Sequence, residues 1–134
     1  HKYFEPYIYR LTIHNRTLED LELVSRQLVY GIWSRGGVDG EGPIAVPAGQ
    51  TVEAMGIHAS EVKRSGYECR CVWGVPEKGN DPAGAVSLFS GGPCMSGRNR
   101  AGLDGSGRLL VQGWTGVSTI GHQFEHELTV RYAL

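Results

Sequence analysis

The stretch YIYRLTIHN, residues 7 to 15, changes character at every second position. Large apolar or aromatic side chains occupy one set of alternate positions, namely Tyr7, Tyr9, Leu11 and Ile13. Successive side chains of a β-strand point to opposite faces, so this alternation predicts a strand with one face in a core.

Similar short stretches follow along the rest of the chain. They cover residues 21–30, 51–59, 67–75, 85–89, 109–114 and 124–134. Twenty glycines and six prolines are spread through the 134 residues, as tight turns between many short strands require. We predict an all-β fold, a single antiparallel β-sandwich domain over residues 1–134, with a barrel as the alternative arrangement.

The charge pattern limits the partners that the protein is expected to have. Thirteen basic and 14 acidic residues are mixed along the chain, and the net charge is −1. A nucleic-acid-binding domain usually carries a basic stripe, so we expect no nucleic-acid partner. No apolar run approaches the roughly 20 residues that span a bilayer, and we expect a soluble chain.

The three cysteines, Cys69, Cys71 and Cys94, allow two interpretations. Cys69 and Cys71 lie two apart on one face of a predicted strand, which is poor geometry for a bond between them. One of them could pair with Cys94, and this disulfide would indicate an oxidising compartment, so that we expect secretion. The alternative is three buried, reduced thiols.

Asn15-Arg16-Thr17 matches the N-x-[ST] pattern, which makes Asn15 a candidate glycosylation site in a secreted protein. The pattern is common by chance. A turn whose asparagine tolerates unusual backbone angles is the favoured alternative.

The segment PCMSGRNRAG, residues 93–102, has the C-x-x-G-x-x-R spacing of a phosphate-binding cysteine phosphatase loop. Such a loop needs a helix after it, to lower the thiol pKa and to direct backbone N–H groups at the anion. Three glycines in the seven positions after Arg100 favour a turn between strands instead. We therefore predict no catalytic residue.

Histidines give only weak indications of a metal site. His122 and His126 are four apart, which brings imidazoles together on a helix but leaves them about 13 Å apart on a strand. His1 could chelate copper if it is the mature N-terminus, a minority interpretation. We predict neither a metal nor a cofactor.

The three tryptophans are expected to have different roles. Trp73 alternates with Cys69 and Cys71 and is predicted to be core, whereas Trp33 and Trp114 stand where strands lead into loops. Exposed aromatic rings with a nearby cation, here Arg35, are how a β domain can contact a lipid head group or a sugar.

Several segments together resemble the aegerolysins, small β-sandwich proteins of fungi and bacteria. In order these are IHNRT, LEDLEL, YGIW, PIAVPAGQTVEAMGIHAS and SLFSGGPCMSGRNR, and the resemblance covers most of residues 7–134. It implies recognition of sphingolipid-containing membranes, no enzymatic activity and, often, action beside a larger pore-forming partner. Family members usually carry an aromatic residue where this chain has Cys94.

We therefore predict a secreted membrane-lipid-binding protein without enzymatic activity. The alternative is a secreted carbohydrate-binding or effector-like module. The candidate lipid-contacting residues are Trp33, Arg35, Arg98, Arg100 and Trp114.

Overall fold

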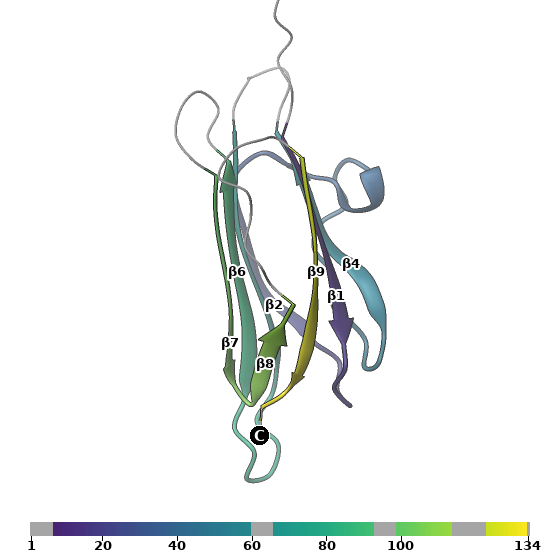
Figure 1. The fold of residues 1–134 in the computed structure, drawn as a ribbon, viewed down its shortest axis with the longest axis vertical. Coiled ribbons are helices and arrows are strands. Elements are labelled where there is room, and N and C mark those ends of the chain that lie inside the picture. The colour runs from purple at the N-terminus through teal and green to yellow at the C-terminus, as the bar shows by residue number, and fades with distance from the viewer. Residues whose placement is uncertain (1–6, 60–65, 93–98, 114–122, 134) are drawn as a thin grey trace, which may run out of the picture.

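The computed structural model describes residues 7–59, 66–92, 99–113 and 123–133, which form two β-sheets packed face to face (Figure 1). The strands are β1 (Ile8–Asn15), β2 (Glu22–Tyr30), β3 (Ile32–Trp33), β4 (Thr51–His58), β5 (Tyr67–Val75), β6 (Gly84–Gly92), β7 (Arg100–Gly107), β8 (Leu109–Gln112) and β9 (Gln123–Tyr132). A short 3-10 turn, η1 (Arg35–Gly37), follows β3. The predicted all-β sandwich is confirmed.

One sheet has five strands in the order β3-β4-β1-β9-β8, and the other has four in the order β2-β5-β6-β7. All strand pairs are antiparallel except one, because β1 and β9 run parallel in the middle of the five-stranded sheet. The predicted antiparallel sandwich is confirmed, with this parallel pair as its one exception among the strand pairs of the described residues. The direction of β9 is set by its antiparallel neighbour β8, from which the chain returns, rather than by β1.

The core lies between the two sheets and is made largely by alternate residues of β1, β5, β6 and β9, with further contributions from other strands and loops. The predicted inward faces of residues 7–15, 67–75 and 124–132 all contribute to it. Trp73 is fully buried, as expected, and its indole N–H donates to the carbonyl oxygen of Ile44 at 2.8 Å. A buried indole keeps its hydrogen bond in this way without water.

Strand β2 does not keep the alternation that the sequence predicts for residues 21–30. Its register against β5 shifts twice, between Leu23 and Ser25 and between Leu28 and Tyr30. A bulge adds a residue to one strand and turns later side chains to the other face. Leu23 and Leu28 are therefore half-buried, and Tyr30 is exposed.

The segment after Arg100 is the strand β7, where we predicted a glycine-rich turn. Its backbone pairs with β6 from Gly84↔Gly107 to Gly91↔Arg100, and this pairing outweighs the low strand propensity of glycine. Gly107 ends β7 with φ of 61°, and a Cβ there would collide with the carbonyl oxygen of Ala83. The glycine is needed for the close approach of the two chains.

Replacement of the buried indole tests how the core is built. We expect Trp73→Ala to lower the free energy of unfolding by about 3 to 5 kcal/mol, because it leaves a cavity and an unpaired carbonyl. Urea denaturation followed by circular dichroism measures this change. Leu110→Ala, at a side chain that is 44% exposed, should change the free energy by less than about 0.5 kcal/mol. Equal losses in the two variants would contradict the assignment of Trp73 to the core.

Candidate functional site

Trp33 ends β3 at the edge of the five-stranded sheet and Arg35 begins the 3-10 turn after it, and both are held by neighbours. Trp33 is half-buried and packs against the core, so it is less exposed than the sequence predicts. The Arg35 guanidinium pairs with Glu41 at 2.5 Å and donates through Nε to the carbonyl oxygen of Gly42 at 3.2 Å. Arg35 therefore organises its own loop, and lipid contact by these two residues stays a prediction.

Of the remaining predicted lipid-contacting residues, the structure describes Arg100 alone. Trp114 and Arg98 lie outside the described residues, as do His1, Cys94 and His122. Arg100 is exposed at the start of β7. Since Arg100 begins a strand, the helix that a phosphatase loop requires does not follow it.

Exposed apolar side chains and an exposed cation occur on β2 and in the loop that follows β3 and η1. We call Arg26, Val29, Tyr30 and Val38 the β2 edge surface. The side chains of Val29, Tyr30 and Val38 are 42%, 58% and 57% exposed. The chain turns from β2 into β3 at Gly31, whose φ is 106°, so the end of β2 and the loop after β3 follow each other around one edge of the sandwich.

Arg26 and Trp33 lie beside the same glycine, Gly42. A Cβ built on Gly42 would lie 2.7 Å from Nη1 of Arg26 and 3.8 Å from Cδ1 of Trp33, so the guanidinium and the indole both border this glycine. Among the described residues no ion pair includes Arg26. Within the described part of the chain, this guanidinium therefore has no carboxylate to release before it can meet an anion.

Sequence reasoning missed the β2 edge surface because it treated residues 21–30 as one regular strand. A signal was present in the run Leu28-Val29-Tyr30, where three large side chains are consecutive and the alternation stops. Three such residues cannot all face one core from a regular strand. At least one had to be exposed or to lie at a bulge.

Asn15 is a structural residue rather than an accessible glycan acceptor. It is fully buried, and its Nδ2 donates to the carbonyl oxygens of Glu19, Val46 and Pro47 at 2.8, 3.0 and 3.3 Å. Its Oδ1 accepts from the backbone N–H and the hydroxyl of Thr17. A glycan on Nδ2 has no room in this fold, so the turn, the favoured alternative, accounts for the pattern.

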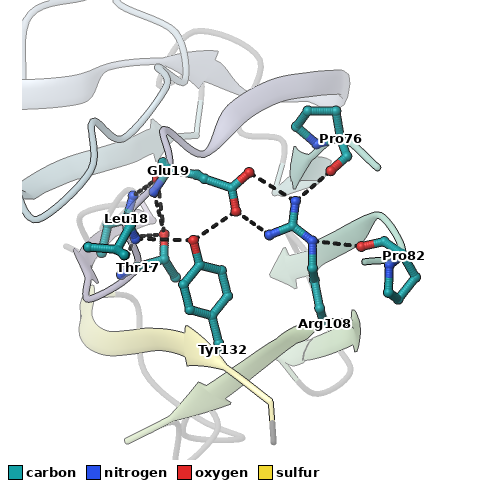
Figure 2. A network of polar contacts seen from close by, with 8 residues as sticks. Thr17, Leu18, Glu19, Pro76, Pro82, Arg108 and Tyr132 are labelled. Atoms are coloured by element: carbon teal, nitrogen blue, oxygen red, sulfur yellow. Dashed lines mark hydrogen bonds and ion pairs between the residues drawn. The ribbon is translucent and has the colours of Figure 1, made fainter. Parts of the chain in front are cut away.

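A polar network joins the loops at one end of the sandwich (Figure 2). Arg108 forms a bidentate ion pair with Glu19, and its other donors bond the carbonyl oxygens of Pro76 and Pro82 at 2.5 and 2.7 Å. The Tyr132 hydroxyl donates to Glu19 at 2.7 Å. Hydrogen bonds from Arg108 and Tyr132 lower the pKa of the Glu19 carboxyl to about 2, from an ordinary value of 4.5.

This network borders an open hollow of about 600 Å³, which also includes Leu18, Lys78 and Asp81. The donors and acceptors of Glu19 and Arg108 are largely used within the network. The charged and hydroxyl groups of Glu19, Arg108 and Tyr132 on its wall therefore already have partners, and we assign the network to stability rather than to binding.

The thiols of Cys69 and Cys71 are both free and fully buried. The disulfide that we predicted between Cys94 and one of them is therefore not formed in the structure. Across β5 and β6 the partners of Cys69 and Cys71 are Ser90 and Leu88, so no cysteine stands opposite either thiol. A hydrogen bond with Cys71, together with burial, raises the pKa of Cys69 and makes it a poor nucleophile at neutral pH.

No protein-family model and no curated protein sequence matches this chain. The described residues contain no helix long and apolar enough to cross a membrane. They also contain no group of three or more histidine, cysteine or acidic side chains that could hold a metal ion. The candidate site therefore depends on the geometry of this chain alone.

The depressed pKa of Glu19 predicts a specific loss of stability in acid. A carboxylate with a lowered folded-state pKa stabilises the fold above its unfolded pKa, and this contribution disappears as the pH falls towards the folded value. The melting temperature of the wild type should fall more steeply between about pH 5 and pH 2 than that of Glu19→Gln. Glu77→Gln, which removes an exposed carboxylate outside the network, should keep the wild-type slope. Parallel curves for wild type and Glu19→Gln would contradict the prediction.

The burial of Cys69 and Cys71 predicts how the thiols react. In the folded protein neither should be alkylated by iodoacetamide within minutes at neutral pH, and both should be alkylated after denaturation without a reductant. Peptide mapping by mass spectrometry identifies each site. Recovery of a peptide in which Cys94 is linked to Cys69 or Cys71 would show that the disulfide forms after all.

Proposed function

We propose that the protein binds sphingolipid-containing membranes through the β2 edge surface and catalyses no reaction. The observations that carry this proposal are the exposed apolar side chains Val29, Tyr30 and Val38 and, on the same strand as the first two, Arg26, a cation with no carboxylate partner among the described residues. A larger pore-forming partner, which the resemblance to aegerolysins implies, and a secreted location belong to the same proposal.

The chemistry of the surface suits the boundary between lipid head groups and acyl chains. Val29 and Val38 would lose contact with water, and Tyr30 can bury its ring while its hydroxyl stays hydrated. Burial of apolar area contributes about 25 cal/mol per Å², or on the order of 1 to 3 kcal/mol for a side chain that is fully transferred. Arg26 supplies a donor fork for the lipid phosphate.

The position of Val29 and Tyr30 also explains why their exposure lowers the stability of the fold only a little. Val29 and Tyr30 follow a bulge at the edge strand, and neither belongs to the core cluster or to the half-buried side chains packed against it. Their replacement can therefore remove binding without unfolding the protein. The same property makes the proposal testable by substitution.

We expect Val29→Ser/Tyr30→Ser to weaken binding to vesicles of phosphatidylcholine and sphingomyelin by about tenfold or more, because it removes two apolar side chains from the contact. Co-sedimentation with vesicles measures the bound fraction. The melting temperature of the variant should stay within a few degrees of the wild type.

The matched control is Leu110→Ser, which removes an exposed apolar side chain from β8, on the other sheet, and should bind as the wild type does. If the double variant also binds as the wild type does, the membrane contact is not the β2 edge surface. If the wild type ignores sphingomyelin vesicles and binds sugars on a glycan array, the carbohydrate-binding alternative replaces the proposal.

A further inference from the structure

We propose that Arg70 and Arg100, with Phe89 between them, form a binding site for a phosphate or sulfate ester on the outer face of the four-stranded sheet. The guanidinium carbon of Arg70 lies 4.6 Å from the centroid of the Phe89 ring, and that of Arg100 lies 5.6 Å from the same centroid. One aromatic ring therefore holds two cations from two different strands.

The register of the sheet explains how the three side chains meet. Arg70 of β5 is the direct cross-strand partner of Phe89 of β6. Arg100 of β7 is the partner of Gly91, the next outward position on β6. The Phe89 ring extends towards Gly91, because a Cβ built there would lie 3.6 Å from Cζ of the ring.

Two glycines keep the space around the ring open. A Cβ on Gly91 would sit under the ring edge, and one on Gly102, the β7 partner of Phe89, would meet no atom within 4 Å. A side chain at Gly102 would stand on β7, directly across from Phe89 and two residues from Arg100. Its absence leaves room for a ligand over the strand β7.

Neither guanidinium takes part in an ion pair in the part of the chain that the structure describes. Both arginines are exposed. This sets them apart from Arg10, Arg35 and Arg108, each of which contacts a carboxylate. The charge of Arg70 and Arg100 is available to a ligand.

The geometry of stacked arginine favours an oxyanion. A guanidinium that lies against an aromatic ring uses its flat face for the ring, so its N–H donors remain free at the edge. These donors match the oxygens of phosphate or sulfate in a bidentate manner. Two such groups around one ring can approach one tetrahedral anion from two sides.

The acidic neighbours limit how the site can work. Glu68 of β5 is opposite Gly91, and Asp104 of β7 is opposite Ser87, so both belong to the same outer face. Their negative charges offset the long-range electrostatic field of the two arginines. The ligand must therefore be attracted through direct contacts. We expect modest affinity and a salt dependence equivalent to about two neutralised anionic groups.

The inference does not rest on the proposed membrane function. Its residues are not those of the β2 edge surface, and its ligand chemistry is found on soluble sulfated sugars as well as on lipid phosphates. The experiment therefore uses a probe from each source.

The soluble probe is a heparin-derived sulfated hexasaccharide, measured by isothermal titration calorimetry, with the desulfated hexasaccharide as its blank. The lipid probe is a phosphatidylcholine vesicle with phosphatidic acid, measured by co-sedimentation. The test variant is Arg70→Gln/Arg100→Gln. The control, Arg16→Gln/Arg131→Gln, has the same net charge and changes two exposed arginines outside β5, β6 and β7.

We expect the wild type and the control to bind at least one probe and the test variant to bind it at least tenfold more weakly. Phe89→Leu, which keeps both charges but removes the ring, should weaken binding about threefold. Binding of the hexasaccharide alone assigns the ester to a sugar, and binding of the vesicle alone assigns it to a lipid. Either result supports the site. The inference is overturned if the wild type binds neither probe, or if the test variant and the control lose affinity equally.

Discussion

The passage of the chain from one sheet to the other at Gly107 and Arg108 is the constraint on which the rest of the sandwich depends. Gly107 lets β7 end against the backbone of Ala83, and Leu109 then begins β8 in the opposite sheet (Figure 1). Arg108 stands at this crossing and bonds Glu19 between β1 and β2 and two carbonyls between β5 and β6. The Tyr132 hydroxyl at the end of β9 bonds the same carboxylate. One guanidinium thus holds together connections that lie far apart in the sequence, and it does so with charge-assisted bonds, which are stronger than neutral ones.

The partners of the arginines separate structural charge from available charge. Arg108 and Arg35 are enclosed by carboxylate and carbonyl oxygens, so their charge serves the loops that they hold. Arg26 lies beside Gly42 instead, and Arg70 and Arg100 lie over the ring of Phe89. A cation kept beside apolar surface gains packing for its stem without losing its donors. The β2 edge surface and the site at Arg70 and Arg100 both follow from this distinction. The net charge of −1 only sums the charges and does not show it.

The alternation of residues 7–15 and 67–75 was enough to predict two strands and their buried faces, because a strand with one face in a core must repeat every second residue. The same argument failed for β2 and β7, where the two-residue repeat of the sequence did not decide the structure. Bulges redirected β2, and backbone pairing with β6 formed β7 in spite of its glycines. The exposure of Trp33 was misjudged for a related reason, since packing against residues distant in the sequence leaves no local pattern. The pairing of Arg70 with Phe89 needed the strand register, which no spacing within either segment contains.

The glycines of this chain have two separate physical roles, and only one of them was visible in the sequence. Gly31 and Gly107 have positive φ angles at turns, the role that a glycine-rich β protein is expected to show. Gly91 and Gly102 lie inside strands, where glycine lowers stability because it has no side chain to pack. The cost is offset on this sheet by what the missing side chains allow, since the Phe89 ring extends over Gly91 and Gly102 leaves the neighbouring surface open. A glycine that weakens a strand beside an aromatic ring and two cations, which have no carboxylate partner among the described residues, supports the proposed contact with a ligand.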